Sequence, residues 1–108
     1  MEVSELIEAI KLLKGAAKKP DESHWKIGKN YFIRTVTHHY TGCLVGVTRQ
    51  ELILKDVAWI ADDGRFAAAV EKGEFNEVEP FPEGEVIIGR GSLIDAYMIR
   101  FDLPRKQK

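Results

Sequence analysis

The 108-residue chain has a single cysteine, Cys43, and no apolar run that approaches the roughly 18 residues needed to span a membrane. One cysteine cannot form an intramolecular disulfide, which indicates a reducing compartment. The first residues, MEVSELIEAIKLL, lack the basic segment that opens a signal peptide. A chain of this length that is 44% hydrophobic can fill one core. We therefore expect a cytoplasmic protein with no membrane partner, folded as one domain over residues 1–108.

The sequence also lacks the basic excess that is typical of nucleic-acid-binding proteins. It has 16 Lys and Arg against 17 Asp and Glu, which gives a formal net charge of -1. The charges are unevenly placed, because the stretch 71–85 is acidic and residues 104–108 form a basic tail. This balance favours a partner other than nucleic acid.

No spacing typical of a metal site or a catalytic centre is present. His38 and His39 are adjacent, so in a strand their side chains point to opposite faces and cannot bind one metal ion together. There is no CxxC or HxxxH spacing either. Cys43 is either a nucleophile activated by His39 or a small core residue, and its place beside a glycine on an apolar strand favours the core. The adjacent Asp62 and Asp63 are explained by a turn and a helix cap. We therefore expect no cofactor, no metal and no catalysis.

Residues 3–18 are predicted to form an amphipathic helix. Its apolar residues recur at steps of three and four, glutamates come early and lysines late, and Pro20 ends it. An isolated helix of this length is only marginally stable in water, so its apolar stripe must pack against something. We expect a lid on the core in preference to a docking helix for a partner. The stripe consists of Leu6, Ala9, Ile10, Leu13 and Ala17.

Residues 25–60 predict three barrel strands in a meander. NYFIRTVTHHY is rich in aromatic and β-branched residues, and Gly28 precedes it as a break or bulge. The stretch 39–42 is predicted to turn the chain into the returning strand CLVGVT, which Gly46 bends. A second turn at Arg49 and Gln50 leads into ELILKDVAWI. Three short strands joined by tight turns, one of them bent at a glycine, predict a small barrel.

Residues 62–84 predict a helical and acidic insert. Asp63 is expected to cap a short helix in RFAAAVEK that ends at Gly73, and NEVEPFPEGE, with its two prolines, predicts an extended loop. The barrel resumes over residues 85–103 with EVIIG and LIDAYMIRF, on either side of a Gly-Arg-Gly corner. That corner is too short for a phosphate loop, and a strand follows it where a phosphate loop has a helix.

Two segments resemble the paired motifs of the Sm-like family. GCLVGVTRQELILKDV (42–57) is similar to the first motif, with a glycine, spaced apolar positions and an apolar-x-Asp ending. VIIGRGSLIDAYMI (86–99) is similar to the second, in which apolar residues lead into Arg-Gly and another strand. The resemblance implies a mainly β fold with short helices. Five strongly bent strands would form an SH3-like/Sm-like barrel, with an N-terminal helix and a helical insert between strands 3 and 4.

The resemblance also implies assembly, because members of this family form rings through edge-to-edge pairing of neighbouring subunits and bind RNA at the inner rim. The first hypothesis is therefore a structural or interaction module, a homo-oligomeric ring that presents its helix and acidic insert to other proteins. The apolar edges of the last two strands would then meet the neighbouring subunits. The residues expected at this interface are Val86, Ile87, Ile88, Ile94, Tyr97 and Ile99.

The alternative hypothesis is an Sm-like ring that binds RNA or other single-stranded nucleic acid. Arg90 and Gly91 match the family's Arg-Gly, whereas the turn TRQE is shorter than the family's first loop and lacks its Asp and Asn. The altered loop and the slightly acidic charge favour the first hypothesis. In the alternative, the phosphate and base contacts would come from Arg34, Arg90, Arg100 and the basic tail, and from Tyr31, Phe32 or Tyr40.

Overall fold

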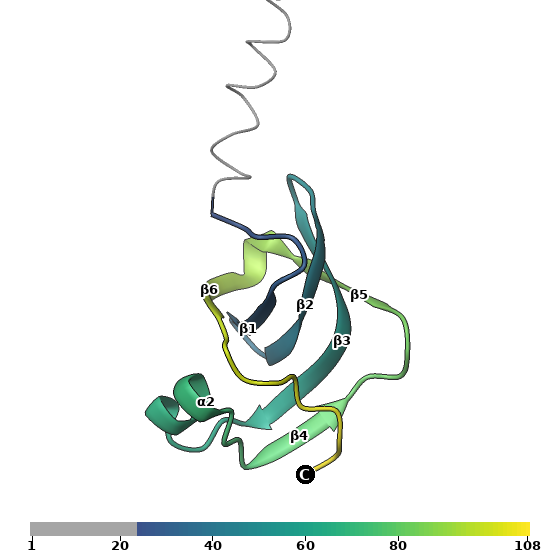
Figure 1. Ribbon diagram of the computed structural model, residues 1–108. Coiled ribbons are helices and arrows are strands. Elements are labelled where there is room, and N and C mark those ends of the chain that lie inside the picture. The colour runs from purple at the N-terminus through teal and green to yellow at the C-terminus, as the bar shows by residue number, and fades with distance from the viewer. Residues whose placement is uncertain (1–23) are drawn as a thin grey trace, which may run out of the picture.

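The structure, a computed structural model, describes residues 24–108 as a mainly β fold with one short helix (Figure 1). The predicted helix at 3–18 lies outside the described residues. Within residues 24–108, no helix is long and apolar enough to cross a membrane. The elements are β1 (Asn30–Thr35), β2 (His39–Val47), β3 (Glu51–Asp62), α2 (Phe66–Lys72), β4 (Glu77–Pro80), β5 (Glu85–Gly89), a 3₁₀ turn η1 (Arg90–Ser92) and β6 (Leu93–Met98).

The first three strands form the predicted antiparallel meander, but its first turn lies earlier than expected. The chain turns at residues 36–38, and β2 already begins at His39. Thr35 closes this turn, because its backbone N–H and its hydroxyl both donate to the carbonyl of His38, at 2.8 and 2.7 Å. The predicted turn at 39–42 is therefore wrong. The β-branched Val36 and Thr37 suggested a continuing strand, and the local hydrogen bonds of Thr35 interrupt it.

Two irregularities bend the β2–β3 pair. The register shifts between Leu44 and Gly46, so the expected bend at Gly46 is present. It shifts again between Thr41 and Cys43, where β3 contributes one more residue than β2, and Asp56 in β3 has a φ of 52°. An extra residue in a strand moves the following side chains to the opposite face. The face of each β3 side chain is therefore set by whether it precedes or follows Asp56.

The long strand β3 pairs with two partners besides β2. Its first half pairs with β5 and its second half with β4, while β6 pairs with β1 at the far side of the sheet. The strand order is β4-β3-β2-β1-β6, with β5 also on β3. No pairing joins β5 to β6 within the described residues, so the sheet is bent but not closed. The predicted five-stranded barrel is therefore corrected to an open, six-stranded antiparallel sheet.

The additional strand, β4, lies in the segment that was predicted to be a loop because of its prolines. Pro80 ends β4 opposite Ala58, and the next residue, Phe81, donates its N–H to Val57 O at 2.8 Å. Hydrogen-bonded and non-hydrogen-bonded pairs alternate in an antiparallel ladder, so Pro80 occupies a position whose nitrogen faces away from β3. A proline there removes no bond to β3, which explains why β4 forms despite it.

The insert also contains the predicted short helix, α2. It ends as expected at Gly73, which has a φ of 70° and donates its N–H to Ala69 O at 3.1 Å. A left-handed residue at this position is typical of helix ends and favours glycine. Within α2, Ala69 faces the core and is fully buried, whereas Phe66 at the start of the helix is exposed.

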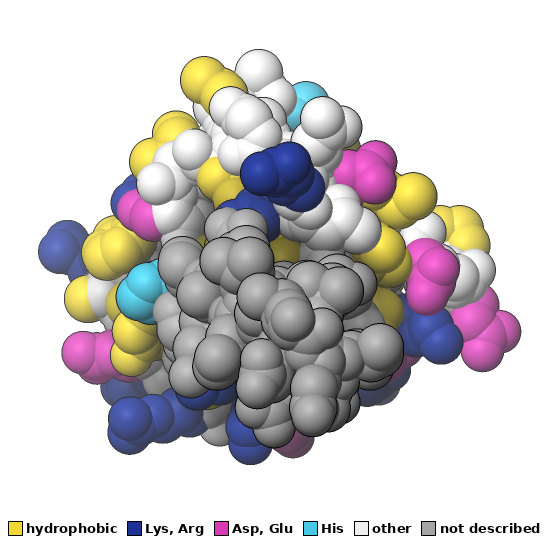
Figure 2. All heavy atoms as spheres, turned by 90° about the horizontal axis from the view of Figure 1, so that it is seen from above, with side chains coloured by type: hydrophobic (Ala, Val, Ile, Leu, Met, Phe, Trp, Pro, Cys, Tyr) yellow, Lys and Arg dark blue, Asp and Glu magenta, His cyan; other side chains and the backbone are white. Residues whose placement is uncertain are grey.

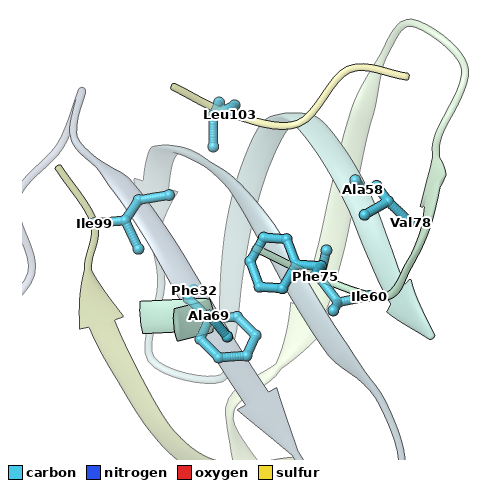
Figure 3. Close-up of a cluster of buried hydrophobic side chains, with 8 residues drawn as sticks. All are labelled: Phe32, Ala58, Ile60, Ala69, Phe75, Val78, Ile99 and Leu103. Carbon is cyan, nitrogen blue, oxygen red and sulfur yellow. The ribbon is translucent and has the colours of Figure 1, made fainter. Parts of the chain in front are cut away.

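Two apolar cores lie on the two faces of the sheet. In β1, Phe32 belongs to one core and its neighbours Tyr31 and Ile33 to the other, as the alternation of side chains in a strand requires. The first core lies under α2 and the segments that follow α2 and β6, and Phe32 and Phe75 meet there at 5.6 Å between ring centroids (Figure 3). The second core fills the bend of the sheet and consists of Tyr31, Ile33, Leu44, Leu52, Leu54, Val57 and Ile88.

The basic tail runs along β4. Val78 and Lys108 exchange backbone hydrogen bonds of 3.1 and 2.9 Å, and Arg105 forms an ion pair with Asp56 at 3.1 Å. The tail therefore pairs with the outer edge of β4, and its charges partly face carboxylates of the same chain.

Candidate interaction surfaces

The first candidate surface is formed by the outer edges of β5 and β6. Each strand pairs on one side only, β5 with β3 and β6 with β1, and η1 joins the two strands (Figure 1). Within residues 24–108, no other strand and no backbone hydrogen bond pairs with either outer edge. An unpaired edge presents N–H and C=O groups that another chain can bind.

The hydrogen bonds beside each ladder show which amides point outwards. The N–H of Arg90 donates to Gln50 O at 2.8 Å, so the preceding pair, Gly89 with Glu51, is a non-hydrogen-bonded pair. By the same alternation, Ile88 bonds to β3 and Ile87 points its N–H away from it. On β6, the N–H of Ile99 donates to Asn30 O at 2.9 Å, which turns the N–H groups of Met98 and Ala96 outwards. The outward amides are those of Ile87, Gly89, Ala96 and Met98.

The structure divides the six predicted interface residues between this edge and the cores. Ile87, Ile94 and Tyr97 are 60%, 61% and 49% exposed, whereas Ile88 and Ile99 are buried. Ile88 belongs to the core in the bend of the sheet and Ile99 to the core under α2, so their side chains are not exposed at this edge. Val86 is half-buried against the core in the bend.

The corner that carries Arg90 and Gly91 is folded back on the turn between β2 and β3. Besides its backbone bond to Gln50, Arg90 donates from its guanidinium to Thr48 O at 2.8 Å. Ser92 fastens the corner from inside through a bond of 2.7 Å from its hydroxyl to Gly89 O. Gly91 has open space where a Cβ would stand. The predicted Arg-Gly loop is thus ordered by contacts within its own chain.

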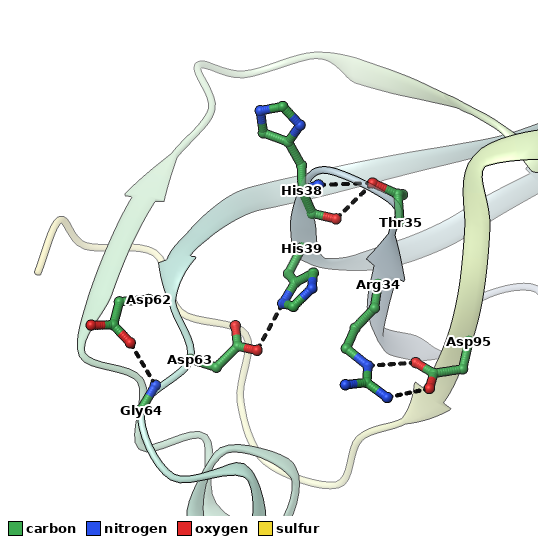
Figure 4. Close-up of polar contacts among 8 residues, drawn as sticks. All are labelled: Arg34, Thr35, His38, His39, Asp62, Asp63, Gly64 and Asp95. Carbon is green, nitrogen blue, oxygen red and sulfur yellow. Dashed lines mark hydrogen bonds and ion pairs between the residues drawn. The ribbon is translucent and has the colours of Figure 1, made fainter.

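Arg34, the third residue of the nucleic-acid hypothesis, faces a carboxylate. Its guanidinium donates two hydrogen bonds to Asp95 across the β1–β6 pair, one of them from Nε to Oδ1 at 2.8 Å (Figure 4). These bonds raise the pKa of Arg34 and hold the pKa of the Asp95 carboxyl below its ordinary value. The guanidinium also lies 5.0 Å from the ring centroid of Phe66. Arg34 therefore holds β6 to β1 and reaches α2.

Two of the aromatic residues that were considered for base stacking are in the core. Tyr31 and Phe32 are only 4% and 2% exposed, so they cannot stack on a nucleic-acid base in the folded protein. Around the undescribed segment in Figure 2, basic, acidic and apolar side chains are interspersed, and neither sign of charge forms a continuous field. The buried rings of Tyr31 and Phe32 and the mixed charges on this face do not form a basic groove with accessible rings.

A second candidate surface lies where β2 meets the end of β3, and it begins with a histidine–carboxylate pair. Nδ1 of His39 lies 2.7 Å from Oδ2 of Asp63, and Asp62 accepts a bond of 2.9 Å from the N–H of Gly64 (Figure 4). Asp63 was predicted to cap α2, but the residue before the helix is Arg65 and no side chain caps it. The carboxylate of Asp63 contacts His39 and not the start of α2, because the β2–β3 pairing brings these two residues together. The described part of the chain contains no group of three or more potential metal-ligating residues.

Four rings form a row on the opposite face of these strands from the His39–Asp63 pair, and we call it the aromatic row; His38 and His39 point in opposite directions (Figure 4). Trp59 approaches His38 at 5.7 Å between ring centroids, His38 stacks on Tyr40 at 6.2 Å, and Tyr40 approaches Phe81 at 6.2 Å. Trp59 and Phe81 are 39% and 41% exposed. The sequence predicted neither the row nor the strand register that forms it. The only signal was an aromatic residue, Trp59, within an apolar strand. The row depends on the Tyr40–Trp59 pairing.

The chain matches no protein-family model, and no curated protein or solved structure is significantly similar to it. Inference about its function therefore depends on the two surfaces themselves.

Proposed function

We propose that the protein is an interaction module that self-associates through the outer edges of β5 and β6 into a cyclic homo-oligomer. The observation that carries this proposal is the set of outward backbone amides on both strands, at Ile87 and Gly89 on β5 and at Ala96 and Met98 on β6. Neither strand contains a proline, one of the devices by which proteins blunt such edges, and the one register irregularity of β6, at Ile94, precedes the outward amides of Ala96 and Met98.

Exposed apolar side chains accompany the free amides. Ile87 on β5 and Ile94 and Tyr97 on β6 are about half exposed or more. When two such edges pair, the backbone groups gain hydrogen-bond partners and these side chains lose contact with water. Both contributions favour an association between copies of the chain.

The geometry supports a ring because the two edges differ. The β5 edge of one copy would pair with the β6 edge of the next, which is a head-to-tail contact. Such contacts end only when the rotation closes, so a discrete cyclic oligomer is expected. The Sm-like family, which the two sequence motifs resemble, assembles in this way. The ring would present the insert with α2 and β4 to other proteins.

The nucleic-acid alternative has less support. Arg34 is paired with Asp95, the Arg90 guanidinium bonds to Thr48 O, and two of the three stacking candidates are buried. Phosphate binding depends on neutralisation by Lys and Arg, and the chain carries a slight acidic excess. No contact of the described residues favours this function.

The mass of the protein in solution tests the proposal. We expect light scattering at micromolar concentration to report several times the 12.2 kDa of one chain. Ile87→Pro removes one outward amide and no bond to β3, so it should give smaller species that keep the native circular dichroism. The matched control Ile87→Thr keeps the amide and the β-propensity and should still assemble. A monodisperse monomer of the unmodified chain would refute the proposal.

A further inference from the structure

We propose that the aromatic row binds an arginine-bearing peptide segment of a partner protein. None of the four rings comes from β5 or β6, so this inference goes beyond self-association through those strands. Trp59, His38, Tyr40 and Phe81 are linked in this order by the ring contacts described above. Rings that are partly exposed and in contact with one another form a surface on which a planar group can stack.

Carboxylates lie along the rim of the row. Glu79 is the direct cross-strand partner of Trp59, so both side chains stand on the same face of the sheet. At one end, Trp59 and His38 line a hollow of about 410 Å³ together with Asp62 and Asp63. At the other end, Phe81 lines a second hollow, of about 280 Å³, that includes Glu83.

Lys and Arg side chains do not balance these carboxylates. No Lys or Arg of the described chain lines the first hollow, where Asp63 has the imidazole of His39 as its partner at 2.7 Å and Asp62 has no ionic partner among the described contacts. The one Arg that lines the second hollow, Arg105, is paired with Asp56 at 3.1 Å. The side chain of Glu79 has a neutral partner, since its Oε1 accepts a bond of 3.2 Å from the amide of Gln107. The row is therefore an aromatic surface with a net negative rim, which is complementary to a cation.

An arginine side chain fits this chemistry better than the other candidates. Its guanidinium is planar, stacks on aromatic faces and binds carboxylates with paired hydrogen bonds, and it loses hydration more readily than an ammonium group. Nucleic-acid bases also stack on rows of rings, but their phosphates would lie close to the acidic rim and be repelled. An apolar peptide would leave the carboxylates without a partner.

Fluorescence anisotropy of labelled peptides tests the inference on the full chain at low ionic strength. The probe is a short Gly/Ser peptide with three arginines, and its matched control carries citrulline, a neutral isostere, at the same positions. We expect saturable binding of the arginine peptide and at least about tenfold weaker binding of the citrulline peptide, because the positive charge carries the cation–π and ion-pair contributions. Equal binding of the two peptides would overturn the inference, as would no binding of either.

Variants locate the site. Trp59→Leu should weaken binding by about tenfold and Glu79→Gln by about threefold, in keeping with single cation–π and exposed ion-pair contributions. Phe66→Leu, which changes an exposed ring on α2, should leave the affinity within about twofold. Unchanged binding by Trp59→Leu would refute the site, and tighter binding of a labelled single-stranded RNA that Trp59→Leu abolishes would assign the row to nucleic acid. Ile87→Pro should keep peptide binding, so failure of the ring and failure of this site are distinguishable.

Discussion

Gly73, which ends α2, offers a sharp test of the fold. It has a φ of 70°, and a Cβ built on it would stand 2.5 Å from Cδ1 and 2.6 Å from Cε1 of Phe101. Phe101 packs against the core under α2 and meets Phe75 at 6.0 Å between ring centroids. Gly73→Ala therefore has two costs. The alanine must adopt the left-handed backbone conformation of Gly73, and its Cβ must displace the packed ring of Phe101.

The two costs can be separated with other glycines. A left-handed conformation costs a non-glycine residue roughly 1–2 kcal/mol, part of which is offset by about 0.4–1 kcal/mol from the lower entropy of the unfolded chain. Displacing a packed ring adds about 1–3 kcal/mol. We expect Gly73→Ala to lower the free energy of unfolding by about 2–4 kcal/mol. Gly28→Ala, with a φ of 86° and open space, should cost about 1 kcal/mol. Gly89→Ala, with neither constraint, should be neutral within about 0.5 kcal/mol.

Thermal unfolding at one protein concentration measures the series, since each kcal/mol shifts the Tm by about 4–8 °C in a domain of this size. Gly73→Ala should lower the Tm less in a Phe101→Leu background than in the unmodified chain. The smaller side chain relieves the clash, while the backbone cost remains. Equal Tm values for Gly73→Ala and Gly28→Ala would refute the contact between Gly73 and Phe101, and with it the packing of the C-terminal segment on α2.

Two further variants test the core and the pairing of β6. Phe75→Ala should lower the free energy of unfolding in urea by about 3–5 kcal/mol, because a buried ring is lost. Phe66→Ala, at a ring that is 53% exposed and contacts only the Arg34 guanidinium among the aromatic and cation–π contacts described, should lower it by about 0.5–1 kcal/mol. Asp95→Asn should destabilise the protein at pH 7 by at most about 1 kcal/mol, since its pair with Arg34 is largely exposed. Because the pKa of Asp95 is lowered in the folded state, this contribution is present above its ordinary value of 3.8 and is lost as the pH falls through the folded value, so both proteins should become equally stable in acid.

The parts of the fold that were predicted from the sequence are those that local pattern determines. The meander follows from dense β-branched and aromatic segments, the bend from Gly46 and the helix end from Gly73. The first turn was misplaced because Thr35 closes it by hydrogen bonds that composition does not show. The strand β4 was missed because Pro80 opposes strand formation only when its nitrogen faces the partner strand, and here it faces away.

The aromatic row could not be predicted for a different reason. Its rings come from the turn before β2, from β2, from β3 and from the segment after β4, and which of them meet depends on the register between the strands. That register depends on the extra residue at Asp56, a non-glycine residue with a positive φ, which no local pattern identifies. Leu52 and Leu54 before the irregularity and Val57 after it reach the same core. Side chains alternate in a strand, so Trp59 shares the face of Val57 and, beyond that core, becomes exposed.

The treatment of the strand edges differs within the same chain, and the difference bears on assembly. The outer edge of β4 is blunted twice, by Pro80 at its end and by the exchange of backbone bonds between Val78 and Lys108. Neither device occurs at β5 or β6 among the described residues, although these strands are longer and carry Ile87 and Ile94 in exposed positions. Exposed apolar edges are liable to non-specific pairing unless a specific partner covers them. Within residues 24–108 the shortest edge is protected and two longer, apolar edges are open, which is the arrangement that the proposed pairing of β5 with β6 between copies would cover.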